Sequence, residues 1–284
     1  MGIGSYDTQH QARPRYAHLA SNLADHHACC APLGLIDGSG HLGQYQIGRP
    51  PWQFALSRAK DRPVSPNRIL SRLSPADIGL LEPHLELVDL PVHRPLEGRN
   101  RRIDYVYFIE AGFASVVANG SGKPGIEVGI IGREGMTGLA IVMGYQRASH
   151  DTYIQAAGKG QRIRAAKLRE ADERSNTLHR AMLRYAHAYL LQTTATALAN
   201  GRSKIEERLA RWLLMADDRI DGDRLPLTHE FLSLMLGVRR SGVTIALQAL
   251  ERKRLISRKR GNILILNRKG LEKQSNGTYL TPEI

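Results

Sequence analysis

The fold of this chain is decided by residues 227–266, LTHEFLSLMLGVRRSGVTIALQALERKRLISRKRGNILIL. Thr228 is a good helix N-cap, and the apolar residues that follow it give the next turns a buried face. Gly237 predicts the end of this helix. A second amphipathic helix follows, with apolar side chains at steps of three or four residues: Val243, Ala246, Leu247 and Leu250. Two such helices joined by a short turn predict a helix-turn-helix, whose second helix lies in the major groove of DNA.

A basic hairpin follows the second helix. Apolar runs at residues 255–256 and 263–266 flank the segment RKRGN, which predicts a two-stranded wing with a basic tip. Residues 239–273 hold eleven Lys or Arg and two Glu, so nine of the thirteen net positive charges of this 284-residue chain lie there. A helical bundle with a solvated charged face would also fit the helices alone. The wing and the concentrated charge favour phosphate binding, and hence DNA.

The run LTHEFLSLMLGVRRSGVTIALQALERKRLI, residues 227–256, resembles the winged helix-turn-helix of the Crp/Fnr superfamily of bacterial transcription regulators. The resemblance extends over roughly residues 70–273. It implies a homodimer that binds double-stranded DNA at half-sites about 34 Å apart. It also implies a small-molecule effector and contact with RNA polymerase as further partners.

The resemblance places the first base-reading arginine of the family on Arg240, whose guanidinium can donate to O6 and N7 of a guanine. Ser241 and Ile245 stand where the best-known members have a glutamate and a second arginine, so the recognised sequence must differ. Ser241 and Thr244 are candidates for base contacts, and Gln248 is a weaker one. Ile245 fits a thymine methyl contact and inward packing equally well. The candidates for phosphate contacts are Thr228, Arg239, Arg258, Lys259 and Arg260.

Residues 67–175 predict a small β-roll preceded by a helix. Ser74 and Pro75 mark a helix start. Short apolar strands separated by glycines follow at residues 85–90, 105–112, 113–118, 126–132 and 153–158. In the Crp/Fnr resemblance this part is the sensor domain, a jelly roll similar to cyclic-nucleotide-binding domains.

The residues that would hold a cyclic nucleotide do not match. The Gly-Glu pair of the family falls on Gly138 and Leu139, and its Arg-Ser pair falls on His150 and Asp151. Leucine cannot accept a hydrogen bond from a ribose hydroxyl, and aspartate would repel a phosphate. A register that uses Arg147 and Ser149 instead needs a gap. We therefore expect no cAMP binding: the roll takes another, unknown effector or serves only as a packing scaffold.

Residues 176–200 predict a long dimerisation helix. Its three- and four-residue repeat forms a seam expected to pack against a second copy: Leu178, Met182, Tyr185, Tyr189, Gln192, Thr196 and Ala199. Gly201 is expected to end this helix and to act as the hinge to a DNA-binding domain, residues 201–273. Residues 204–217 predict another amphipathic helix that buries Ile205, Leu209, Trp212, Leu213 and Met215 and leaves Glu206, Glu207 and Arg211 in solvent.

The two ends of the chain carry less information. Residues 1–66 predict a disordered arm, and residues 274–284 predict a frayed tail. His26, His27, Cys29 and Cys30 have the chemistry of metal ligands. Consecutive ligands rarely reach one metal, and no second cluster completes a site, so we expect no metal and no cofactor. The sequence shows neither a signal peptide nor an apolar run of about 20 residues, which predicts a cytoplasmic protein with no membrane segment.

The sequence therefore predicts an α+β protein: an N-terminal β-roll, a long dimerisation helix and a C-terminal winged helix-turn-helix. The function expected is sequence-specific transcription regulation by a homodimer. The alternative is an architectural or replication-type winged-helix protein without an effector. Because no catalytic triad, P-loop or carboxylate pair stands out, we do not expect an enzyme.

Overall fold

The computed structural model describes residues 65–120, 125–222, 224–259 and 261–281. All of these belong to the unit that runs from Pro51 to Ile284. The predicted arm lies outside the described residues except for positions 65 and 66, and so does the cluster of His26, His27, Cys29 and Cys30.

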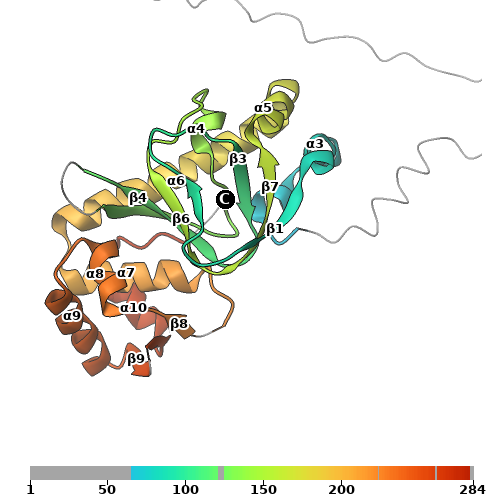
Figure 1. The fold of residues 1–284 in the computed structure, drawn as a ribbon. Coiled ribbons are helices and arrows are strands. Elements are labelled where there is room, and N and C mark those ends of the chain that lie inside the picture. The colour runs from blue at the N-terminus through green and yellow to red at the C-terminus, as the bar shows by residue number, and fades with distance from the viewer. Residues whose placement is uncertain (1–64, 121–124, 223, 260, 282–284) are drawn as a thin grey trace, which may run out of the picture. The chain divides into compact units, whose positions relative to one another are not determined.

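Two antiparallel sheets form the β-roll within the described residues (Figure 1). Their strand orders are β1-β7-β3 and β2-β6-β4-β5. The strands are β1 Glu86–Leu90, β2 Pro95–Glu97, β3 Tyr105–Ile109, β4 Phe113–Ala118, β5 Ile126–Ile131, β6 Asp151–Ala156 and β7 Gly158–Arg164. Side chains from both sheets meet in a core that includes Leu90, Ile109, Ile131 and Ile154. The predicted β-roll is confirmed.

The sequence did not predict β7, although it is the central strand of its sheet. Its sequence GKGQRIR has no apolar alternation, and among its residues only Gly160 and Ile163 are buried. The strand is held by backbone pairing with β1 and β3 on its two sides. A Cβ atom at Gly160 would lie 2.5 Å from the carbonyl oxygen of Phe108, so a glycine is required at this close approach.

Helices cover the roll: α2 Arg68–Arg72, α3 Pro75–Leu81, a 3₁₀ turn Glu82–His84, α4 Leu139–Val142, α5 Ala165–Arg174 and α6 Asn176–Arg202. Ser74 caps α3 as predicted, and Ser175 accepts a hydrogen bond from Leu178 N at the start of α6. The prediction that Gly201 ends α6 is wrong, since the helix continues to Arg202. One glycine costs a helix about 1 kcal/mol, which the remaining turns can offset.

The seam of α6 that was expected to face a second copy is occupied by the chain itself. Leu178, Met182 and Tyr185 are buried against the roll and its covering helices. Gln192 makes two hydrogen bonds to β5, to the N and O atoms of Ile130, at 2.7 and 3.1 Å. The expectation that this face packs on a second copy is therefore corrected, because a period of 3.6 residues reveals a buried face but not its partner.

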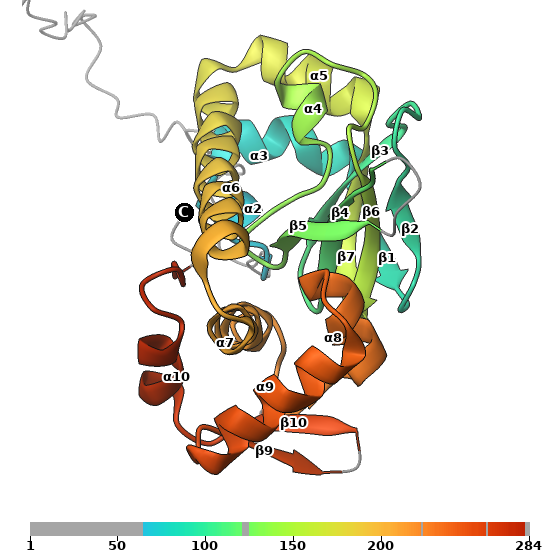
Figure 2. The ribbon, with the colours of Figure 1, turned by 90° about the vertical axis from the view of Figure 1, so that its left-hand side faces the viewer.

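The head, residues 205–274, comprises α7 Ile205–Asp217, β8 Arg224–Pro226, α8 His229–Leu236, α9 Arg240–Arg252, β9 Ile256–Lys259, β10 Asn262–Ile265 and α10 Arg268–Gln274 (Figure 2). The predicted wing is confirmed as β9 and β10. A short strand, β8, joins them in the order β8-β10-β9, where the sequence had predicted two strands.

Helix α7 is covered on several sides, so its predicted solvent face is partly wrong. Arg211, expected in solvent, is only 5% exposed. Its guanidinium donates to Thr278 O at 2.9 Å and to Gln192 O at 3.2 Å. The predicted frayed tail is also packed over part of its length, since Ser275 and Thr278 are buried.

The roll and the head share one hydrophobic core. Phe113, Val117 and Ile130 of the roll lie in the same cluster as the buried residues of α7, α8 and α9. The Trp212 ring lies between Phe113 and Phe231, with centroid distances of 6.3 and 5.5 Å. A buried ion pair adds to this junction, because Arg219 Nη2 lies 2.6 Å from Glu134 Oε1.

Asn67 joins the start of α2 to the roll, and this contact can be tested. Its Nδ2 donates to Ile109 O and Gly135 O, both at 2.8 Å, and its Oδ1 caps the N–H groups of Ile69 and Leu70. Asn67→Ala should reduce the free energy of unfolding by about 3 kcal/mol, because two buried carbonyls lose their donor and a helix loses its cap.

Urea denaturation followed by circular dichroism measures this loss. Ser71→Ala is the control, because its hydroxyl donates to Arg68 O at an exposed position, and it should change stability by less than about 0.5 kcal/mol. Equal losses in the two variants would contradict the assignment.

Candidate functional site

The geometry of the helix-turn-helix follows the sequence prediction closely. Thr228 Oγ1 accepts a hydrogen bond from Phe231 N at 3.1 Å and begins α8. Gly237 ends α8 with φ of 62°, a left-handed conformation that favours glycine. Arg239 is then the N-cap of α9. The four apolar residues predicted to point inward on α9 are all buried: Val243, Ala246, Leu247 and Leu250.

The opposite face of α9 is open to solvent. Arg240, Ser241 and Gln248 are exposed. Ile245 is 58% exposed, which decides between the two expectations for it: the side chain does not pack inward. Thr244 is half-buried, and its hydroxyl lies 3.0 Å from His229 Nδ1 and donates to Arg240 O at 3.1 Å. The hydroxyl of Thr244 is therefore engaged within the head, whereas Arg240, Ser241 and Ile245 face outward.

The candidates for phosphate contacts differ in their surroundings. Arg239 and Lys259 are exposed, and Thr228 is exposed beside the start of α8. Arg258 forms an ion pair with Glu251 at 2.7 Å, and its hydrogen bonds lower the pKa of the Glu251 carboxyl. Arg260 lies outside the described residues.

A second candidate site is a cavity of about 430 Å³ between the roll and α6. Its walls are mostly apolar, with Met136, Leu139 and Met143 on one side and Ala186 and Leu190 of α6 on the other. This volume is in the range of small-molecule sites. The sequence indicated this region only through the family resemblance, since its wall is assembled from distant segments.

The polar groups of the cavity do not suit a cyclic phosphate. Leu139 and His150, two of the mismatched positions, line it, and none of the described lining residues is Lys or Arg. Burial lowers the pKa of His150, which favours its neutral form at neutral pH. Glu97 brings a carboxyl group to the wall and accepts hydrogen bonds from Gly138 N and Thr152 Oγ1, at 2.8 and 2.7 Å. Arg147, from the alternative register, is exposed and donates to Asn100 O.

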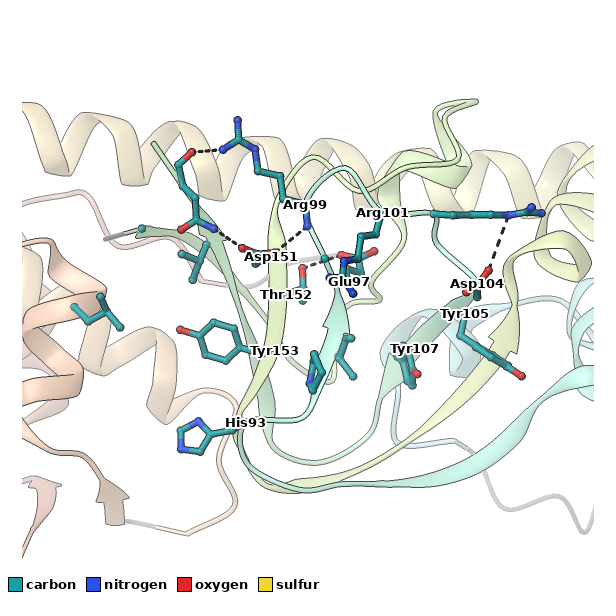
Figure 3. A pocket seen from close by; sticks show the side chains of 18 residues that line it. His93, Glu97, Arg99, Arg101, Asp104, Tyr105, Tyr107, Asp151, Thr152 and Tyr153 are labelled. Carbon is teal, nitrogen blue, oxygen red and sulfur yellow. Dashed lines mark hydrogen bonds and ion pairs between the residues drawn. The ribbon is translucent and has the colours of Figure 1, made fainter. Parts of the chain in front are cut away.

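A larger open groove, about 1080 Å³, lies on another side of Glu97 (Figure 3). Several of its polar groups are paired with one another. Asp151 accepts from Arg99 N at 2.8 Å, and Thr152 donates to Glu97. Figure 3 shows Arg99, Arg101 and Tyr105 spread along the groove rather than directed at one point. The apolar cavity is therefore the more developed site for a ligand.

These features define a class: a winged helix-turn-helix joined by a long helix to a jelly-roll domain. Residues 207–274 match the family model of the Crp-like helix-turn-helix domain. No curated protein sequence matches the chain. The DNA-binding domain predicted from residues 227–266 is thus confirmed by an independent comparison.

Solved structures with the same fold extend the comparison to the roll. FixK2 from Bradyrhizobium japonicum matches with a TM-score of 0.57 and 16% identity, over 67% of this chain and 96% of that one. A Crp/Fnr family regulator from Eubacterium rectale matches with a TM-score of 0.59 and 17% identity, over 74% and 98%. The c-di-GMP responsive regulator CLP of Xanthomonas campestris matches at 0.56 and 14%, over 68% and 99%. The chain therefore has the fold of Crp/Fnr transcription regulators and carries a Crp-like DNA-binding domain.

The described residues contain neither a membrane-spanning helix nor a cluster of metal ligands. No helix among them is both long and apolar enough to span a bilayer. Among the same residues, no group of three or more His, Cys, Asp or Glu is placed to hold a metal ion. The cytoplasmic location and the absence of enzymatic activity stay predictions.

Proposed function

We propose that this protein is a homodimeric, sequence-specific transcription regulator whose roll responds to a ligand other than cAMP. The observation that carries the proposal is the outward face of α9, where Arg240, Ser241 and Ile245 stand in solvent beside a basic wing. Arg240 can distinguish a guanine by two parallel hydrogen bonds, worth about 1–3 kcal/mol. Ser241 offers a further base contact, and the exposed Ile245 suits the methyl group of a thymine.

Support for a homodimer comes from the solvent face of α6. Leu183, Leu190, Leu191 and Leu198 are 42%, 60%, 47% and 50% exposed. The pairs 183/190 and 191/198 are seven residues apart, which is the repeat of helices that wind around each other. A second copy of α6 is the natural cover for this face, since it would place two α9 helices on one duplex.

Support for a ligand other than cAMP comes from the cavity beside α6. Its described lining is mostly apolar, includes the Glu97 carboxyl group and contains no Lys or Arg, and burial lowers the pKa of His150, so the lining suits a phosphate poorly. The alternative function, an architectural winged-helix protein without an effector, would show the same operator affinity under all ligand conditions. Contact with RNA polymerase stays a prediction.

Selection of bound sequences from a random double-stranded pool tests the DNA-binding proposal. The protein should enrich a palindrome with a guanine opposite Arg240. In Arg240→Ala, affinity for that operator should fall about 10- to 100-fold, because a bidentate base contact is lost. Affinity for random DNA should fall no more than about threefold, because the many other basic side chains still contact the DNA phosphates.

Lys259→Ala is the matched control, as it removes one charge from the wing. This variant should lower the affinity for operator DNA and the affinity for random DNA by similar factors. Equal losses on both DNAs for Arg240→Ala, or a pool without any enriched sequence, would overturn the proposed readout.

Leu190→Glu should dissociate the dimer, because it places two like charges in an apolar seam. The dissociation constant should rise at least about 100-fold, given about 1.5–3 kcal/mol for each leucine that loses its burial. Sedimentation velocity over a range of protein concentrations measures it. Leu87→Glu, at a 70% exposed position on β1, is the control and should leave the dimer intact. A wild-type protein that sediments as a monomer would contradict the proposal.

Titration calorimetry with cAMP should show no saturable binding up to about 1 mM, because no Lys or Arg among the described lining residues faces the cavity and a buried phosphate would lack a strong partner. A micromolar dissociation constant would contradict the assignment, and Ala186→Trp, which fills the cavity, would then show whether that binding occurs there.

A further inference from the structure

Glu127 is a buried carboxyl group at the junction between the roll and the head. It lies in β5 and is 5% exposed. Its Oε1 accepts a hydrogen bond from Trp212 Nε1 of α7 at 2.5 Å. Its Oε2 accepts one from Ser115 Oγ of β4 at 2.6 Å. One carboxyl group thus holds a side chain of the head and a side chain of the roll at the same time.

The surroundings of Glu127 oppose its charge. Burial raises the pKa of this carboxyl to about 7, although several contacts act in the other direction. These contacts are the hydrogen bonds from Ser115 and Trp212 and the charges of Arg211 and Arg219. Both protonation states are therefore accessible near neutral pH.

The other titratable groups that face Glu127 do not change their protonation state near neutral pH. Burial raises the pKa values of Tyr153 and Tyr189, so both phenols stay neutral. Burial lowers the pKa of Arg208. Arg208, Met235 and Leu236 line a cavity of about 20 Å³ next to Glu127. That space is large enough for one water molecule, through which the carboxyl group can exchange its proton.

The hydrogen bonds also determine where the proton binds. An indole N–H can only donate, so Oε1 must stay an acceptor in both states. A serine hydroxyl can donate or accept, so Ser115 can turn to accept from a protonated Oε2. The neutral carboxyl group therefore keeps both hydrogen bonds without the cost of burying a charge.

We propose that Glu127 is a latch between the roll and the head, and that its protonation tightens their contact. When the head is released from the roll, Glu127 is solvated and has its ordinary pKa of 4.5. Between pH 4.5 and about 7, Glu127 retains a proton while the head is docked and gives it up when the head is released. The docking equilibrium therefore weakens by up to about tenfold per pH unit as the pH rises through this window, and it is constant above it.

Fluorescence of Trp212 tests the latch directly. The chain has two tryptophans, so Trp52→Phe isolates the signal of Trp212. We expect its emission to titrate with a midpoint near pH 7, and Glu127→Gln, which imitates the neutral acid, to abolish this titration. Ser115→Ala should move the midpoint upward, because the charged form loses a donor. A titration that survives Glu127→Gln, or no titration between pH 5.5 and 8.5, would overturn the proposal.

Glu110→Gln is the matched control. Glu110 is a buried carboxyl group of the roll, 6% exposed, with hydrogen bonds to Ser65 and Gln161 rather than to the head. This variant should leave the midpoint of the Trp212 titration unchanged. A shift as large as that of Ser115→Ala would assign the signal to general stability instead of the latch, and would count against it.

The effect of the latch on DNA rests on the proposed function and is measured separately. The ratio of operator affinities at pH 6 and pH 8 should differ by about threefold or more between the wild type and Glu127→Gln. The comparison with the variant removes contributions from groups other than Glu127. Identical ratios, with an intact Trp212 titration, would overturn the regulatory role and leave DNA binding itself untouched.

Discussion

The packing of Trp212 between a phenylalanine of the roll and one of the head is the contact on which the arrangement of the molecule depends. Large aromatic side chains bury much apolar surface, and here that surface is shared by two parts of the chain. The buried Arg219–Glu134 pair strengthens the dependence, because removal of one partner would leave a desolvated charge, at a cost of about 3–5 kcal/mol. The position of α9 therefore depends on the packing of the head against β5 and the loop that follows it.

The sequence predicted the head well because its signals are local. Thr228, Gly237 and the four apolar positions of α9 act within one or two helical turns, and all take their expected places. Most strands of the roll were predicted for the same reason. Strand β7 was missed because it is held by backbone pairing rather than by apolar side chains, and Arg211 was misplaced because its partners, Gln192 and Thr278, are distant in sequence.

The candidate sites also differ in whether local sequence signals or contacts between distant residues define them. The outward direction of Arg240 and Ser241 follows from helical periodicity, whereas the exposure of Ile245 needed the structure to decide it. The residues by themselves predicted neither the apolar cavity beside α6, which only the family resemblance indicated, nor the role proposed for Glu127. A single acidic residue inside the apolar run IEVGII was the available signal, and its meaning depends on Ser115 and Trp212, which only the fold brings to it.

Helix α6 serves two surfaces, since its Leu190 belongs both to the rim of the cavity and to the exposed apolar face. With a second copy on that face, occupation of the cavity and association of the subunits become linked equilibria. A ligand that fits better beneath the partner helix would then bind more tightly at high protein concentration. The abundance of the protein in the cell would itself set the ligand level at which it responds.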